Sequence, residues 1–207
     1  YNVNIVNSTA TVTLINDDVH IFSIPETGYS TPDSYDGMTM VWSDEFDGSE
    51  INSNNWTFEM GTGNGGWGNN ELQYYQEDNT RIIDGNLVIE ARRQTLENSN
   101  YTSSRLITRG KQSFKYGRVD IRAVMPEGQG IWPALWMLGS NHSQVGWPTC
   151  GEIDIMEMIG GEEKDNVVHG TAHWNQGGVV SYGQSMTNES GKLSEEYHVY
   201  SIIWDEQ

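Results

Sequence analysis

Three carboxylates lie close together between two glycines of this chain. Glu152, Asp154 and Glu157 alternate with isoleucine and methionine residues between Gly151 and Gly160. A short apolar run rich in branched residues is typical of a strand, in which Glu152 and Asp154 share one face. Same-face carboxylates without interleaved basic residues repel one another, which makes a merely solvated face a poor alternative. We interpret this stretch as an active-site strand; an acidic outer face or a cation site is the alternative.

Glu157 interrupts the two-residue period of the strand. It follows Glu152 by five residues, so a regular strand would point it to the other face. One extra residue near Ile155-Met156, a β-bulge, returns it to the acid face, and bulges are common beside active sites. Four effective steps of ~3.3 Å then separate the two Cα atoms by ~13 Å. Two long side chains leaning together bring their carboxyls toward the ~5 to 5.5 Å of a retaining glycosidase.

Composition limits the class of protein and the kind of partner. The chain has 207 residues with 8 Trp, 10 Tyr and 23 Gly, which fits one β-rich, sugar-handling domain. Its net charge of -18 argues against nucleic acid and disfavours sulfated polysaccharides, so a neutral glycan is the better partner. No run of eighteen apolar residues exists, and we expect no membrane insertion. We expect a secreted, extracellular monomer whose signal peptide is removed or lies upstream.

The first 36 residues differ from the rest in composition and in their pattern of predicted secondary structure. An alternating strand at residues 10–15 ends in a turn cluster and resembles the last strand of a Calx-β type repeat. The stretch through Pro25, Gly28 and Pro32 has the composition of a linker. We therefore predict a linker or remnant of a preceding Calx-β-like module at residues 1–36, with a disordered leader as the alternative, and one domain at residues 37–207.

From Met38 onward the pattern is all-β, because short strands alternate with Gly, Asn and Asp turns and helical periodicity is nearly absent. Strands are expected at residues 86–92, 105–108, 116–125, 131–138 and 167–174. The last of these is the expected hairpin partner of the acid strand. His173 lies on its presumed cleft face, where we expect a supporting role.

Trp132 and Trp136 are four residues apart in the expected strand at 131–138 and would project to the same side. Aromatic rings stack on the C–H faces of sugars, but tryptophan is also commonly buried packing. Nearness to the acid strand favours a sugar platform for at least one of them. A glycine-rich loop at residues 61–71 suits close approach to a ligand and lacks the lysine of a phosphate-binding loop.

Together these segments resemble glycoside hydrolase family sixteen and, within it, the laminarinases, which are endo-β-1,3-glucanases. The resemblance runs from about Met38 to the C-terminus. It is carried by residues 42–46 (WSDEF), 66–75 (GWGNNELQYY), 128–137 (GQGIWPALWM) and 147–157 (WPTCGEIDIME).

The resemblance implies a β-jelly-roll sandwich of two curved antiparallel sheets with a concave substrate cleft. It also implies hydrolysis with retention of configuration, with Glu152 as nucleophile, Glu157 as acid/base and Asp154 hydrogen-bonded to the nucleophile. No cofactor is implied for catalysis, and a structural calcium would use Glu45 and Gly85. Sugar contacts are implied at Asn69, Arg105, Trp132, Trp136 and His173.

One departure separates the chain from the family pattern. Family members continue with several strands beyond the one expected at residues 200–205, so we expect C-terminal strands of the jelly roll to be absent here. Related hydrolases of mixed-linkage glucan, agar or carrageenan are alternatives within the class. A non-catalytic β-glucan-binding module and an acidic, calcium-dependent adhesion fragment are alternatives outside it.

Overall fold

A computed structural model describes residues 24–206, so the strand expected at residues 10–15 lies outside the described residues. Within this range no helix is long and apolar enough to cross a membrane. The strands are β1 (Thr57–Glu59), β2 (Gln73–Tyr75), β3 (Thr80–Ile83), β4 (Asn86–Ile89), β5 (Tyr101–Ser103), β6 (Arg105–Ile107), β7 (Gly117–Ala123), β8 (Ala134–Leu138), β9 (Glu152–Glu157), β10 (Val167–Asn175), β11 (Val179–Thr187) and β12 (His198–Trp204).

The prediction of an all-β protein is confirmed. Helical structure in the described range is limited to α1 (His142–Val145) and the short turns η1 (Gly66–Asn70) and η2 (Glu77–Asn79). The largest sheet has the order β11-β10-β9-β8 and is antiparallel throughout. The pairs β1-β6, β3-β4 and β7-β12 are also antiparallel, whereas β2 and β5 are parallel.

The acid strand, β9, lies inside the largest sheet and contains the predicted bulge. On β8, Leu135 pairs with Met156 and Trp136 pairs with Asp154, so Ile155 has no partner residue there. The register against β10 shifts at the same place. The extra residue changes which face the following side chains occupy, as the spacing of Glu152 and Glu157 requires.

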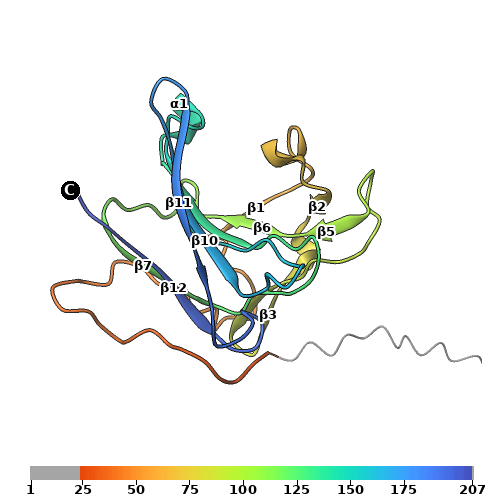
Figure 1. Cartoon of the computed structure of the whole chain (residues 1–207), viewed down its shortest axis with the longest axis horizontal. Coiled ribbons are helices and arrows are strands. Elements are labelled where there is room, and N and C mark those ends of the chain that lie inside the picture. The colour runs from red at the N-terminus through yellow and green to blue at the C-terminus, as the bar shows by residue number, and fades with distance from the viewer. Residues whose placement is uncertain (1–23, 207) are drawn as a thin grey trace, which may run out of the picture.

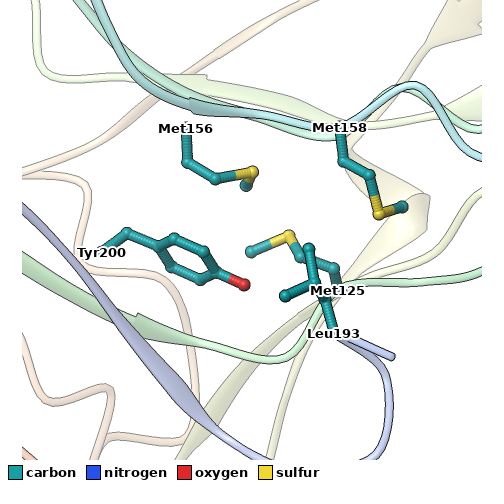
Figure 2. Packing of buried hydrophobic residues seen from close by; sticks show 5 residues of the cluster. All are labelled: Met125, Met156, Met158, Leu193 and Tyr200. Carbon is teal, nitrogen blue, oxygen red and sulfur yellow. The ribbon is translucent and has the colours of Figure 1, made fainter. Parts of the chain in front are cut away.

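The core explains why the bulge is stable. Met156 and Met158 are fully buried and point from the acid strand and its continuation toward Met125, Leu193 and Tyr200 (Figure 2). Tyr200 belongs to β12, so this cluster joins the largest sheet to the β7-β12 pair. Burial of Met156 on one face holds Glu157, the next residue, on the opposite face.

Residues 27–35, here called the strap, lie along β7 and β12 (Figure 1). The amide of Tyr29 donates to the carbonyl of Tyr197 at 2.8 Å, and Arg122 donates to the carbonyl of Tyr29 at 2.8 Å. The hydroxyl of Tyr35 donates to Asp120. The expected linker is therefore in contact with the domain that follows it, while the boundary at residues 36 and 37 stays a prediction.

Candidate active site

Glu152, Asp154 and Glu157, here called the acid row, lie on one face of β9. A carboxylate oxygen of Glu152, one of Asp154 and a ring nitrogen of His173 all lie within 4.8 Å of one another. The charges of both glutamates act on Asp154, which lies between them on the strand. The structure thus brings together the three carboxylates that the sequence singled out.

The neighbouring strands place a row of side chains on each side of the acid row. On β10, His173 pairs with Glu152, Thr171 with Asp154 and His169 with Glu157. Residues paired in register on adjacent antiparallel strands share a face of the sheet. The partners on β8 are Leu138, Trp136 and Ala134, in the same order.

Asp154 is the most protected member of the row, with 5% of its surface exposed. Burial raises the pKa of Asp154 to about 8, and the charges of Glu152 and Glu157 and a hydrogen bond with Glu152 act in the same direction. At neutral pH Asp154 therefore retains a proton that it can donate to Glu152. His173 completes the contact, because its Nε2 lies 3.2 Å from Asp154 Oδ2.

Trp132 contacts the other end of the row. Its indole Nε1 donates to Glu157 Oε1 at 2.9 Å, and 48% of the residue is exposed. The strand expected from residue 131 begins only at Ala134, because Pro133 has no N–H to donate to a ladder. Trp132 is therefore presented by a loop, and its exposure leaves an aromatic face open beside the acid row.

Trp136 and Arg105 form part of a stack with Trp67. The Arg105 guanidinium carbon lies 4.6 Å from the centre of the Trp67 ring and 4.7 Å from that of Trp136. Its Nε also forms an ion pair with Glu59 Oε2 at 2.8 Å. Two of the expected sugar contacts thus pack on each other and link the loop at residues 61–71 to the sheet that carries the acid row.

Asn69 lies in that loop and is exposed. Its Nδ2 donates to Glu71 Oε1 at 3.1 Å, and Glu71 also accepts from Gln73 and the hydroxyl of Tyr75. The loop is wound tightly around Trp67: a Cβ on Gly63, where φ is +58°, would lie 2.5 Å from the indole ring. Asn69 is thus held by its own loop, and its expected contact with sugar stays a prediction.

Trp147 is a site residue that the sequence reasoning did not single out. Its ring lies 6.1 Å from that of His173 and 47% of the residue is exposed. A signal for it existed, because Trp147-Pro148 begins the motif that leads into the acid strand. Glu59, the partner of Arg105, carried no such signal, because only the β1-β6 pairing brings it opposite Arg105.

Two sets of residues offer ligands for a metal ion. Glu152, Asp154 and His173 have suitable spacing, but a ligating carboxylate must be deprotonated, and the raised pKa of Asp154 opposes this. The calcium ligands expected at Glu45 and Gly85 are exposed and offer one carboxylate and one carbonyl, whereas Ca²⁺ takes about six to eight oxygens. These two residues alone do not make a calcium site.

Comparisons with known proteins agree with the geometry. The model of glycosyl hydrolases family 16 matches residues 67–207. A beta-glucanase of Rhodothermus marinus is 43% identical over 177 residues, which span 80% of this chain and 59% of that protein. The glucan endo-1,3-beta-glucosidase A1 of Niallia circulans is 37% identical over 199 residues, which span 86% of this chain and 29% of that protein.

A solved structure shares the fold. The laminarinase catalytic domain from Thermotoga maritima MSB8 is 47% identical, with a TM-score of 0.74 over 81% of this chain and 70% of that chain. The predicted class, a β-jelly-roll sandwich, is thereby confirmed. The chain spans less than two thirds of the two curated relatives, at 59% and 29% of their lengths.

Proposed function

The chain belongs to glycosyl hydrolases family 16, and from this premise we propose that it is an endo-acting β-1,3-glucanase that retains anomeric configuration. The observation that carries the proposal is the bulged strand β9, on which Glu152 and Glu157 flank a buried Asp154 on one face. Two carboxyls at the ends of one glycosidic bond are the requirement of double displacement.

The proposed first step forms a covalent glycosyl-enzyme. The carboxylate of Glu152 attacks the anomeric carbon while the carboxylic acid of Glu157 donates its proton to the glycosidic oxygen, which leaves as an alcohol. Asp154, which holds a proton at neutral pH, donates a hydrogen bond to Glu152 and thereby keeps the nucleophile oriented without adding a third negative charge. His173 holds Asp154 from the neighbouring strand.

The proposed second step returns the enzyme to its starting state. The carboxylate of Glu157 removes a proton from a water molecule, and the water oxygen attacks the anomeric carbon. The bond to Glu152 breaks, which releases Glu152 as a carboxylate. Two inversions at one carbon give net retention of configuration. The Trp132 indole, 2.9 Å from Glu157, supports the acid/base carboxyl through both steps.

The substrate class follows from charge and from the relatives. One relative is named an endo-1,3-beta-glucosidase and the matched solved structure a laminarinase. The net charge of -18 disfavours a sulfated chain such as carrageenan. We therefore propose neutral β-1,3-glucan as substrate, in an extracellular setting, for a protein that acts as a monomer.

Hydrolysis assays test this function. Release of reducing ends should be fastest on laminarin, slower on lichenan and negligible on agarose and carrageenan. Glu152→Gln and Glu157→Gln should each lower the turnover of laminarin by about 10²-fold or more, whereas Glu189→Gln, at an exposed position between β11 and β12, should not change it. Release from agarose or carrageenan alone would contradict the substrate, and intact activity of Glu152→Gln would contradict the nucleophile.

Azide separates the two glutamate roles and tests retention. In Glu157→Ala acting on an aryl glycoside, azide should attack the glycosyl-enzyme and give a β-glycosyl azide. In Glu152→Ala, azide should occupy the space of the missing carboxylate and give the α-anomer. Laminarin that is bound but never cut by the wild-type chain would instead support the alternative, a non-catalytic glucan-binding module.

The calcium ion expected at Glu45 and Gly85 stays a prediction, to be tested by thermal unfolding with and without calcium.

A further inference from the structure

The loop that carries Trp132, residues 126–133, is held by the chain that follows the acid strand. The residues on either side of Trp132 accept hydrogen bonds through their carbonyls: Ile131 from the amide of Gly160 at 2.8 Å, and Pro133 from the amide of Met158 at 3.2 Å. Because Trp132 precedes β8, its position depends on these loop contacts rather than on the strand ladder.

Asp165 joins the two loops at a single atom. Its Oδ1 accepts the backbone N–H of Gly128 at 3.0 Å and the backbone N–H of Gly161 at 3.0 Å, and only 9% of the residue is exposed. These two amide donors hold the pKa of Asp165 below its usual range. The carboxylate thus ties the start of the Trp132 loop to the glycine turn after β9.

The two loops approach so closely that neither glycine of the turn after β9 has room for a side chain. A Cβ on Gly160 would lie 2.7 Å from the carbonyl oxygen of Gly128 and 2.9 Å from Asp165 Oδ1. A Cβ on Gly161, where φ is +94°, would lie 2.7 Å from the Cα of Gln129. The glycine pair therefore serves this contact as well as the turn.

We propose that Asp165 is a positioning residue for the acid/base carboxyl: by accepting both amides it fixes the Trp132 loop so that the indole N–H stays on Glu157. The proposal rests on the proposed function of Glu157. Asp165 acts here through the backbone of two loops and through Trp132, at the end of the site where the leaving oxygen takes up its proton.

The position of Trp132 can be measured without any hydrolysis. Asp165→Ala removes the acceptor, and Asp165→Asn keeps one carbonyl oxygen in the same place for both amides. The indole ¹H–¹⁵N resonance of Trp132, identified by its loss in Trp132→Phe, should shift and exchange faster with solvent in Asp165→Ala. It should stay close to its wild-type position in Asp165→Asn and in the control Lys164→Ala, an exposed neighbour in the same loop.

Kinetics with two leaving groups test the catalytic consequence. A glucan oligosaccharide leaves poorly and needs the proton from Glu157, whereas a dinitrophenyl group leaves without it. Because general acid catalysis is worth about 10²–10⁴-fold, a misplaced Glu157 in Asp165→Ala should lower kcat/KM on the oligosaccharide by about tenfold or more. On the dinitrophenyl oligosaccharide kcat/KM, which reports the first step alone, should fall by less than about threefold. The double variant with Trp132→Phe should lose little more than the worse single variant, because both act on one interaction.

The outcomes separate this proposal from the proposed function. If the wild-type chain hydrolyses nothing, the function fails, while the indole resonance still tests the role of Asp165. An unmoved indole resonance in Asp165→Ala, equal losses of kcat/KM on both substrates, or additive losses in the double variant would each overturn the proposal. Should Asp165→Ala not fold, Asp165→Ser, whose hydroxyl falls short of the two amides, takes its place with the same expectations.

Discussion

Asp154 is the carboxyl of the site whose pKa is shifted most clearly by its surroundings. It is nearly fully buried between two glutamates and contacts His173, and its pKa is raised to about 8. A buried carboxyl that keeps its proton acts as a hydrogen-bond donor rather than as a third anion. The row therefore carries less charge at neutral pH than its three acidic residues suggest, which lowers the repulsion that the strand has to withstand.

This protonation predicts how stability depends on pH. An aspartate in the unfolded chain has a pKa of about 3.9, so between that value and about 8 the folded protein holds a proton that the unfolded chain has released. The contribution of Asp154 to the free energy of unfolding therefore falls as pH rises from about 4 to about 8, with a limiting slope of about 1.4 kcal/mol per pH unit.

Asp154→Asn removes the titrating carboxyl. Its free energy of unfolding, relative to wild type, should increase steadily as pH rises from about 5 to 8, while hydrolysis of laminarin falls. Urea unfolding at several pH values measures the first effect. Parallel stability curves for the two proteins would show that Asp154 is ionised throughout and would contradict the assignment.

The placement of the carboxylates on one face of a strand was the easiest feature of the site to predict from the sequence. Glu152 and Glu157 are five residues apart, and only an inserted residue puts them on one face, so the spacing itself predicted the bulge found at Ile155. The contact between Trp132 and Glu157 could not be predicted in this form, because Pro133 delays the strand and leaves Trp132 on a loop. Trp147 was missed because its nearness to His173 arises only when the chain folds back.

The positions of individual strands could be predicted from the sequence, whereas the pairing of distant strands could not. Alternation located β7 and β10 within about two residues, because alternation is a local property. The parallel pairing of β2 with β5 and the pairing of β1 with β6 depend on contacts across some thirty to fifty residues of chain. For this reason the stack of Trp67, Arg105 and Trp136 was not foreseen, although Arg105 and Trp136 were each expected in the site.

The stack predicts a specific effect of Arg105→Lys. Lysine keeps the charge but has no planar group to lie between two rings. Losing two ring contacts of about 0.5–1 kcal/mol each should make opening of the loop at residues 61–71 roughly tenfold more frequent. Hydrogen exchange of the amides in that loop measures the change, and KM for laminarin should rise with it.

Arg109→Lys is the matched control for that experiment. Arg109 also forms an ion pair with Glu59, at 3.2 Å, but its side chain is 54% exposed. If both variants speed exchange equally, the ion pairs with Glu59 hold the loop and the ring contacts do not.

At the scale of the domain, the strap extends the folded unit toward the N-terminus. Tyr35 donates to Asp120, and its ring lies 4.2 Å from the guanidinium carbon of Arg118. Burial raises the pKa of Asp120, but the hydrogen bonds from Ser201, Tyr35 and Arg118 outweigh it and hold that pKa below its usual range. A carboxyl of this kind stabilises the fold above its unfolded pKa and loses that effect as pH falls through the folded one.

Tyr35→Phe should therefore lower the free energy of unfolding at neutral pH, because Asp120 loses one of its hydrogen-bond donors. The loss should shrink as pH falls below the ordinary aspartate pKa of about 3.9 and through the lowered pKa of Asp120, and hydrogen exchange at the amide of Tyr29 should quicken. Tyr101→Phe, at an exposed position on β5, serves as control. Unchanged exchange at Tyr29 would mean that the hydrogen bonds of the Tyr29 backbone with the Tyr197 carbonyl and the Arg122 side chain hold the strap without Tyr35.

The side on which the strap lies also matters for polymer binding. Its contacts with Asp120 and Arg122 are on the outer surface of the β7-β12 pair, whereas the acid row belongs to the other layer, beyond the methionine core. If the chain cleaves glucan as proposed, the strap therefore does not cover the face of the sheet on which the two glutamates lie. Cleavage within a long polymer, as proposed here, needs that face to be open on both sides of the site, whereas a segment lying across it would favour attack at chain ends.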